Sequence, residues 1–503
     1  MLSIRPVNKA PANLVHSFLD HRLAGILLHP SSLPGSGPFG GFGKEAFRFV
    51  DFLFEAGMGV WQVLPLGPVS DDLSPYDSAS AFAGNPMFID LNDFVDLGLL
   101  TSDYRPPDTI HDHIKLIDAA YDACKASDSN NCAEIKLQLK KFSVANKDWL
   151  LDYALFRVIQ KQQGQPWYLW PEDLKKHDAE ALCKIKNQYP DEIKKVYFKQ
   201  YFFHKHWKAL KTYANKKNIK LLGDLPIFVA HNSADVWSHQ EQFNLDEQGM
   251  PVTVAGVPPD YFSETGQRWG NPHYRWDIMA EDEFGWWRRR VSHLLDWFDW
   301  VRIDHFRGLE SYWEIPAEEK TAIQGRWIKA PGDMFLHYLL ENHHALPFVA
   351  EDLGIITEEV NKLREKYCLP GMKVLQFAFD SDDDNPYLPH NYTENCVVYT
   401  GTHDNNTVIG WFTDLSDQQK HRVLDYLDQP KAPMPLPLIQ CALSSKAKLA
   451  IIPMQDVLAL GANERMNTPG HSDGNWQWRF TWDQLEPDLA KNLSDWNREY
   501  KRV

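Results

Sequence analysis

The sequence predicts an α/β fold, specifically a closed (β/α)8 barrel. Short β-branched runs that end in polar, Gly or Pro residues recur along the chain, and each is followed by a stretch with helical character. Strands that alternate with helices favour a parallel sheet, and eight strands are the number that closes such a barrel. The eight candidate strands are residues 23–30, 59–68, 219–229, 300–306, 346–354, 371–379, 396–405 and 449–456.

The uneven spacing of these strands predicts two insertions. About 150 residues separate the second strand from the third, far more than one crossover needs. Residues 92–205 are expected to form a mainly helical insertion, because apolar residues recur there three and four positions apart. Residues 230–295 are rich in Gly, Pro and aromatic residues and predict a long structured loop. We expect one unit spanning residues 1–503, not two independent domains.

Composition and charge exclude several classes of partner. The 503 residues are 44% apolar and 24% charged, as in soluble globular proteins. A net charge of −16 opposes nucleic-acid binding, which needs a basic surface, and favours a neutral ligand. No apolar run approaches the roughly 18 residues of a membrane helix, so no membrane partner is expected. The 19 Trp and 19 Tyr often lie beside Gly, Pro, Asn or Asp, which suits stacking on sugars or aromatic ligands.

The cysteines and the N-terminus predict a cytoplasmic protein. Six scattered cysteines with no CxxC pair argue against a disulfide framework and a zinc ribbon, and fit a reducing compartment. The first 20 residues contain neither the apolar core nor the small-residue cleavage site of a secretory signal.

Polar residues fall at the ends of the candidate strands, where a (β/α)8 barrel collects its functional groups. Strand periodicity of two places Arg302 and Asp304 on one face of their strand, and Val301 and Ile303 on the other. The strand-end polar residues are His29, Asp224, Arg302, Asp304, His305, Glu351, Asp352, His403, Asp404 and Asn405.

Three of these acids suit glycosidic chemistry. Arg302 favours the ionised form of Asp304, as a nucleophilic carboxylate requires. Glu351 follows the apolar residues 347–350, which would raise its pKa and suit it to protonate a leaving oxygen. Asp404 is a third acid, suited to binding sugar hydroxyls near the reacting carbon.

Other chemistries find less support. The pairs His111/His113, His204/His206 and His343/His344 are spaced like metal ligands, but none adjoins the strand-end acids, so no metal is expected. The chain lacks the GxSxG elbow of a serine nucleophile. The glycine-rich residues 35–43 lack the GK[ST] ending of a phosphate loop.

Longer motifs carry a resemblance to a known family. They include LLHPSSLPG, SPYDSASAFAGNP, GDLPIFVA, PPDYFSETGQRWGNPHYRW, VRIDHFRGL, VAEDLG, GTHDN and ERMNTPG, nearly end to end. The chain resembles the amylomaltases, the 4-α-glucanotransferases of glycoside hydrolase family 77. VRIDHFRG and THDN fit the whole α-amylase clan, whereas the SPYDS and GQRWGNP loops narrow the resemblance to this family.

The resemblance implies a role for each matching residue. Asp304 would be the nucleophile that forms a covalent glucosyl ester, Glu351 the acid and then the base, and Asp404 a stabiliser of the transition state. His305 is expected to touch substrate. The other residues implied to bind substrate are Tyr76, Asp224, Asp260, Tyr261, Phe262, Gln267, Trp269, Arg302, Asp380, His403 and Asn467. Asp260, Tyr261 and Phe262 match a loop that covers the cleft, within residues 251–270.

The resemblance also implies an activity and an architecture. The expected enzyme moves α-1,4-glucan segments between maltooligosaccharides or amylose, releases glucose from small donors, and serves starch, glycogen or maltose metabolism. It would work without a cofactor, as a monomer or weak homodimer, and would lack a C-terminal β-sandwich domain. Retention of configuration predicts that the Asp304 and Glu351 carboxyls lie roughly 5–5.5 Å apart.

Two alternatives remain open from the sequence. The first is an α-glucan hydrolase of the same clan. The second is a non-catalytic glycan-binding protein, against which the presence of Asp304, Glu351 and Asp404 speaks.

Overall fold

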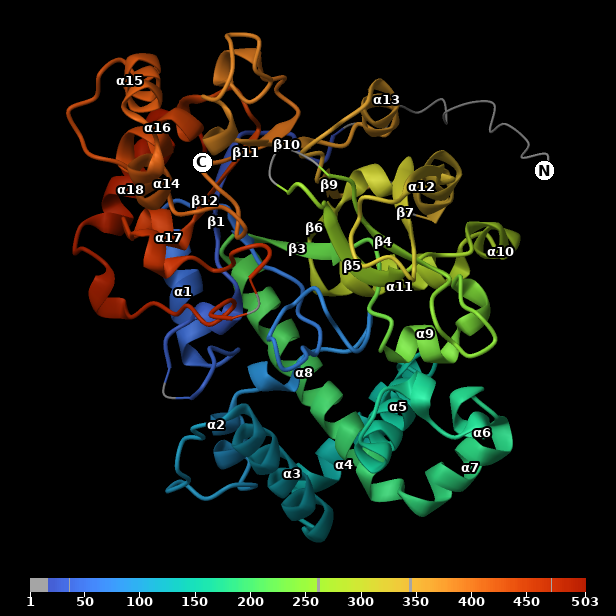
Figure 1. Cartoon of the computed structure of the whole chain (residues 1–503). Coiled ribbons are helices and arrows are strands. Elements are labelled where there is room, and N and C mark those ends of the chain that lie inside the picture. The colour runs from blue at the N-terminus through green and yellow to red at the C-terminus, as the bar shows by residue number, and fades with distance from the viewer. Residues whose placement is uncertain (1–16, 36, 260–262, 343–345, 472) are drawn as a thin grey trace.

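The structure, a computed structural model, describes residues 17–35, 37–259, 263–342, 346–471 and 473–503. Its centre is a closed parallel barrel with the strand order β1-β12-β11-β10-β9-β6-β3-β2 (Figure 1). Each strand lies inside one of the eight predicted runs, so the predicted (β/α)8, or TIM, barrel is confirmed. The strands are β1 (Leu23–Leu27), β2 (Val60–Gln62), β3 (Lys220–Pro226), β6 (Trp300–Asp304), β9 (Phe348–Ala350), β10 (Gly371–Val374), β11 (Cys396–Tyr399) and β12 (Leu449–Pro453).

The barrel strands are short apolar runs because helices cover their outer faces and side chains fill the interior. Every residue of β2, β11 and β12 is buried. Gly25 in β1 pairs with Val60 of β2 on one side and Ile451 of β12 on the other. A Cβ atom at Gly25 would lie 2.5 Å from the Val60 carbonyl oxygen, so only glycine fits between these strands.

Helices surround the barrel (Figure 1), and several of them bury an apolar face. In α11 the buried residues include Trp287, Val291 and Leu294, which recur at the spacing of one helix face. The covering helices are α1 (Lys44–Glu55), α8 (Pro190–Lys216), α11 (Gly285–Trp297), α12 (Gly332–Asn342), α13 (Glu358–Lys366), α14 (Val408–Asp414), α15 (Asp417–Tyr426), α16 (Leu436–Ser444) and α18 (Leu489–Glu499).

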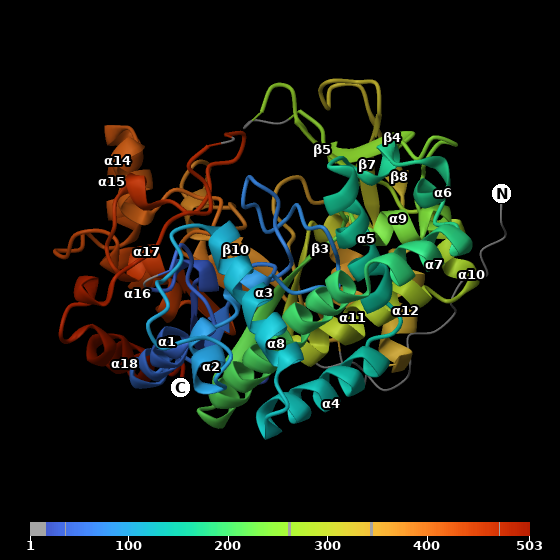
Figure 2. The same ribbon diagram turned by 90° about the horizontal axis from the view of Figure 1, so that it is seen from below.

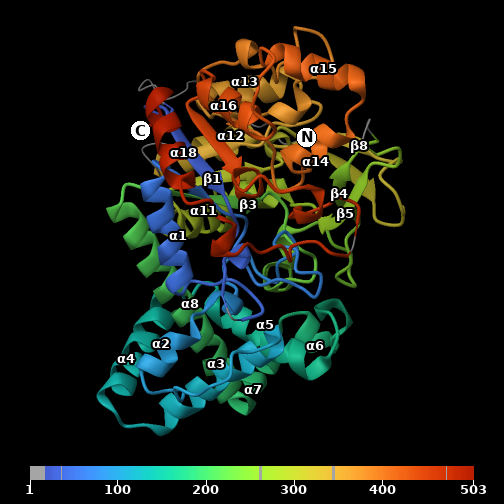
Figure 3. The same ribbon diagram turned by 90° about the vertical axis from the view of Figure 1, so that its left-hand side faces the viewer.

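The segment between β2 and β3 forms a helical group to one side of the barrel (Figures 1 and 3). The 27-residue helix α8 runs from this group back to the start of β3. Thr109 and Ser129 cap two of the helices through side chains that accept backbone N–H bonds. The group comprises α2 (Leu91–Asp96), α3 (Ile110–Ala126), α4 (Asn130–Ala145), α5 (Leu150–Gln163), α6 (Glu172–Lys175) and α7 (Ala179–Gln188).

A second sheet, which the sequence analysis did not predict, stands at one edge of the molecule (Figure 2). Its antiparallel order is β5-β4-β7-β8. Two strands fall where a loop was expected, and two lie between the fourth and fifth barrel strands. They are β4 (Thr253–Val257), β5 (Gln267–Pro272), β7 (Ser311–Pro316) and β8 (Arg326–Lys329). The short helices α9 (Ala234–Ser238) and α10 (Trp276–Glu281) lie between β3 and α11 in the chain.

The chain after the last barrel strand is helical. It contains α17 (Met454–Val457) and α18, and the described residues beyond Pro453 include no β-strand. Within the described ranges, no helix combines the length and apolar character needed to cross a lipid bilayer.

Candidate active site

Arg302 forms two ion pairs at the carboxyl end of the barrel. Its strand β6 pairs in register with β3, which places Arg302 opposite Asp224. Arg302 Nη1 donates to Asp224 Oδ2 at 2.6 Å, and Nη2 donates to Asp304 Oδ1 at 2.7 Å. Burial disfavours the charge of Arg302, but the two carboxylates outweigh burial and raise its pKa. The guanidinium is therefore a permanent positive charge between two acids.

Tyr76 and His403 form a stacked pair against this network. Tyr76 follows β2 and His403 follows β11; their rings lie 5.4 Å apart and 19° from parallel. The Tyr76 hydroxyl donates to Asp224 Oδ2 at 2.7 Å and lies 3.0 Å from His403 Nε2. Burial raises the pKa of Tyr76, which keeps the phenol protonated. Because that proton goes to Asp224, His403 Nε2 must itself carry a proton to bond the phenol oxygen.

A hollow opens beside Tyr76 and Asp224. Pro226, Phe228 and Arg290 also line it.

Glu351 follows β9 and is held by two backbone N–H groups. Its Oε2 accepts from His305 N at 2.7 Å, and Oε1 accepts from Leu353 N at 3.0 Å. His305 reaches this position with a φ of 52°, an unusual conformation for a non-glycine residue. Burial raises the pKa of Glu351 to about 7 and the charge of Asp304 adds to the rise, whereas Arg302 opposes it. Glu351 therefore carries a proton in a large fraction of molecules near neutral pH.

Asp404 lies between His403 and Asn467. Asn467 Nδ2 donates to Asp404 Oδ1 at 2.6 Å, and His403 Nε2 lies 3.3 Å from Oδ2. Burial would raise the pKa of Asp404, but His403 and Asn467 lower it to about 2. Asp404 is thus ionised at any working pH, and Asn467 lies in direct contact with it.

Trp269, Gln267 and His305 form a further group next to Glu351. The ring of Trp269 in β5 lies 4.9 Å from the His305 ring, edge to face. Trp269 Nε1 donates to Gln267 Oε1 at 3.1 Å. Burial, followed by the charge of Arg307, lowers the pKa of His305 to about 3, so the imidazole is neutral.

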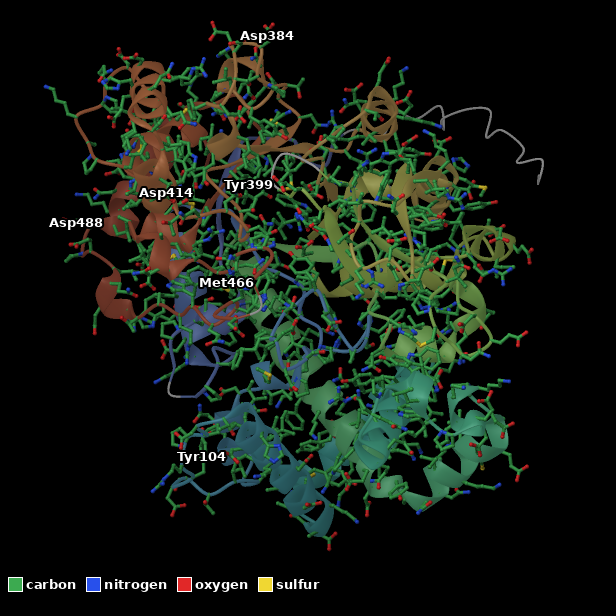
Figure 4. The ribbon with its side chains drawn as sticks, viewed as in Figure 1. Tyr104, Asp384, Tyr399, Asp414, Met466 and Asp488 are labelled. Carbon is green, nitrogen blue, oxygen red and sulfur yellow. The ribbon has the colours of Figure 1, made fainter. Side chains whose placement is uncertain are left out.

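For four predicted substrate-binding residues, the structure describes no contact with the residues around Arg302, Glu351 and Asp404. Asp380 is exposed, and its Oδ1 accepts from Asn385 Nδ2 at 2.9 Å. Asp384, in the same loop, lies at the outer edge of the molecule (Figure 4). Asp260, Tyr261 and Phe262 lie outside the described residues.

Two residues of the site were missed by the sequence analysis. Trp476 lies 6.0 Å from the Tyr76 ring and 5.9 Å from the His403 ring, and is almost fully buried. No local pattern distinguishes it from the other tryptophans. Asp456 accepts from Thr400 Oγ1 at 2.6 Å and from Val408 N at 2.8 Å, so it fastens both ends of the loop that carries His403 and Asp404. Asp456 could have been selected from the sequence, because it is a polar residue at the end of the eighth predicted strand.

Metal-ligand geometry is not seen in the described part of the chain. Within those residues, no three His, Cys, Asp or Glu side chains are grouped so that they could hold a metal ion. His343 and His344 lie outside the described residues.

This chain is similar to known proteins in both sequence and fold. A family model described as 4-alpha-glucanotransferase matches residues 28–485. The 4-alpha-glucanotransferase of Thermus thermophilus is 46% identical over 94% of this chain and 97% of its own. The chloroplastic/amyloplastic 4-alpha-glucanotransferase of Solanum tuberosum is 44% identical over 96% of this chain and 87% of its own.

A solved structure agrees with these relatives. The amylomaltase of Streptococcus agalactiae, in complex with acarbose, superposes with a TM-score of 0.91 at 36% identity, over 96% of this chain and 99% of that one. Three independent comparisons therefore reach one conclusion over nearly the whole length. This chain belongs to the 4-α-glucanotransferases of glycoside hydrolase family 77, and it is an enzyme with transferase activity.

Proposed function

We propose that this transferase moves α-1,4-glucan segments by a retaining double displacement, through a covalent glucosyl ester on Asp304. The observation that carries the proposal is the contrast between two neighbouring acids. Asp304 is paired with Arg302 at 2.7 Å, whereas the pKa of Glu351 is raised to about 7. A charged nucleophile beside a protonated acid is the combination that retaining glycosidic chemistry requires.

In the first step, a carboxylate oxygen of Asp304 attacks C1 of the donor sugar. The bond between C1 and the glycosidic oxygen breaks, and the proton of Glu351 passes to that oxygen. The reducing-end fragment leaves with a free 4-hydroxyl, and this fragment is glucose when maltotriose donates a maltosyl unit. Glu351 is left as a carboxylate, accepting the N–H bonds of His305 and Leu353.

In the second step, the 4-hydroxyl of an acceptor sugar attacks the same C1. Its proton passes to Glu351, the ester bond to Asp304 breaks, and both acids return to their starting states. Two inversions give net retention. Positive charge that develops on the reacting sugar faces Asp404, whose pKa is lowered to about 2 and which is therefore charged throughout the cycle.

Transfer is faster than hydrolysis when an acceptor sugar, and not water, occupies the position from which the ester is attacked. Trp269 offers an exposed ring next to His305 and Glu351, where an acceptor sugar would stack. Ala322 N donates to Thr265 O at 3.0 Å, which ties the end of the predicted covering loop to residues 317–325. An acceptor held in this way reaches a high effective concentration and displaces water.

Product analysis from maltotriose tests the transfer. We expect glucose together with maltotetraose and longer oligomers, whereas glucose and maltose alone would indicate the hydrolase alternative. Asp304→Ala should abolish turnover, while Asp384→Asn, at an exposed acid on the outer edge of the molecule (Figure 4), should leave it unchanged. If the wild type binds glucans without turning them over, and Asp304→Ala binds them equally well, the non-catalytic alternative would be supported instead.

The covalent ester can be tested separately. An α-maltosyl fluoride donor has a leaving group that needs no acid, so Glu351→Gln should still form the ester but resolve it slowly. We expect acid-quenched Glu351→Gln to carry a maltosyl adduct on the peptide that contains Asp304, detected by mass spectrometry. A β-configured product with no adduct would contradict the double displacement.

A further inference from the structure

Two tryptophans stand out by exposure. All 19 lie within the described residues, and among them only Trp269 and Trp327 are exposed, with 40% and 39% of the residue surface accessible to solvent. Both lie against residues 304–307, the segment that begins at the proposed nucleophile: Trp269 contacts His305 and Trp327 contacts Arg307. The two rings lie on opposite edge strands of the second sheet, β5 and β8, and each contacts the segment that begins at Asp304, which makes each a candidate contact for a sugar ring.

Trp327 is fixed in place before any ligand arrives. The guanidinium carbon of Arg307 lies 3.7 Å from its ring centroid. Trp313, directly opposite in the β7–β8 pairing, contacts it edge to face at 5.2 Å. Trp313 is itself held by a 2.9 Å bond from Nε1 to the Ala322 carbonyl. A ring so constrained loses little conformational entropy when a ligand stacks on it.

The position of Trp327 relative to Glu351 identifies which half of the substrate it would meet. The segments 304–307 and 351–355 leave the catalytic centre side by side. They are joined at the inner end by the bond from His305 N to Glu351 Oε2, and at the outer end by Arg307 Nη1, which donates to the Ile355 carbonyl. Trp327 stacks on Arg307 at this outer end. Glu351 protonates the departing reducing-end fragment, so that fragment and the acceptor that replaces it lie on this side.

We infer that Trp327 is a stacking platform for the acceptor chain, beyond the sugar that meets Trp269 and His305. Its ligand is the reducing-end portion of an α-1,4-glucan, whose sugar rings present apolar C–H faces to the indole. The inference rests on the proposed function, because it assigns the acceptor to the Glu351 side. It makes Trp327 a determinant of acceptor length: a long acceptor reaches it and glucose does not.

Acceptor competition measures this role. With α-maltosyl fluoride as donor, kcat/KM is determined for glucose and for maltotetraose as acceptors in the wild type, Trp327→Ala and Trp327→Phe. The ratio of kcat/KM for maltotetraose to kcat/KM for glucose should fall about tenfold in Trp327→Ala. This is the size of effect expected for one well-placed aromatic contact. Trp327→Phe, which keeps a flat ring, should recover most of the ratio. Phe54→Ala, an exposed aromatic on α1, serves as the control and should not change it.

Other outcomes overturn the inference. A ratio equal to that of the wild type in Trp327→Ala shows that acceptors do not reach the ring. Equal losses for both acceptors, together with a lower melting temperature, show that Trp327 only supports the second sheet. Failure of the proposed function is distinguishable, because the wild type itself would then transfer to neither acceptor.

Discussion

At residue 302 a guanidinium is buried between two carboxylates, in a strand whose other residues, apart from Asp304, are apolar. Removing these charges from water is costly, and the cost is offset only because both arms of Arg302 are bonded to acids. The phenol of Tyr76 adds a third bond, to Asp224. Asp224 Oδ1 is buried without a hydrogen-bond partner, so this carboxylate depends wholly on the bonds to its other oxygen.

Tyr76→Phe tests that dependence. The substitution keeps the ring stacked on His403 but removes the donor to Asp224, so we expect kcat for maltotriose to fall about ten- to a hundredfold. The KM should change much less, because the stacking face remains. Tyr76→Ala removes the ring as well and should raise KM. Steady-state kinetics of the two variants separate these roles; a Tyr76→Phe enzyme with wild-type kcat would show that the bond to Asp224 is not used.

The raised pKa of Glu351 predicts a loss of activity at alkaline pH. The first step needs its proton, and its pKa is raised to about 7, so kcat/KM for maltotriose should be level below that value and decline as the pH rises through it. Initial rates between about pH 5 and 9 measure this decline. With α-maltosyl fluoride, which needs no acid, formation of the ester should lack the decline. A decline that begins near pH 4.5 would mean that burial does not protect the proton.

At the scale of elements, the site depends on how loops are fastened to the barrel. The loop between β11 and α14 carries His403 and Asp404, and Asp456, just after β12, holds it at both ends. The buried carboxylate of Asp456, which follows β12, thus fixes the position of His403 and Asp404, which follow the neighbouring strand β11.

Asp456→Ala should therefore affect both stability and catalysis. It leaves Thr400 Oγ1 and Val408 N without their acceptor, and we expect a loss of about 2 kcal/mol in the free energy of unfolding, along with a lower kcat. Asp456→Asn should be milder, because its amide can accept from Val408 N and donate to the Thr400 hydroxyl. Urea unfolding measures the loss. Equal effects of Ala and Asn would contradict this account.

Asp456 also predicts a pH dependence of stability. Burial raises its pKa to about 6, above the value in the unfolded chain, so its contribution is fully present below the unfolded pKa and is lost as the pH rises through 6. Asp456→Asn should remove this part of the decline in the free energy of unfolding between about pH 4 and 6.

At the scale of the molecule, the first and last barrel strands close the barrel. β1 pairs with β12, and Arg502 is fully buried beneath them. Its guanidinium donates to four carbonyls: Leu443 at 2.6 Å, Leu23 at 2.9 Å, Ser445 at 3.0 Å and Ala442 at 3.3 Å. The last turn of the chain therefore ties the end of α16 to the first strand.

Arg502→Ala should destabilise the whole barrel. Four carbonyls would lose a charged donor, and we expect the free energy of unfolding to fall by about 3 kcal/mol in urea. Arg498→Ala, whose side chain is 68% exposed, is the matched control and should change it by less than about 0.5 kcal/mol. The acceptor preference of the folded Arg502→Ala enzyme should equal that of the wild type, since the substitution is remote from the cleft.

Barrel strands were predictable, and the candidate acids could be selected, because their signals are local. A buried strand reads as a short apolar run, and a polar residue at its end is visible in the same few positions, as for Asp304, Glu351 and Asp404. The second sheet had no such signal: its strands are short, contain Gly, Pro and Arg, and are stabilised by pairing with distant segments, as Gly256 pairs with Trp313.

The sequence by itself determined the barrel and the family and supplied the candidate acids, because periodicity and motifs are properties of neighbouring residues. Only the tertiary structure decided the partners: Asn467 against Asp404, Trp476 against Tyr76, and Arg307 against Trp327. These contacts join residues up to 400 positions apart, and they form because barrel closure brings the strand ends together, which no local pattern encodes.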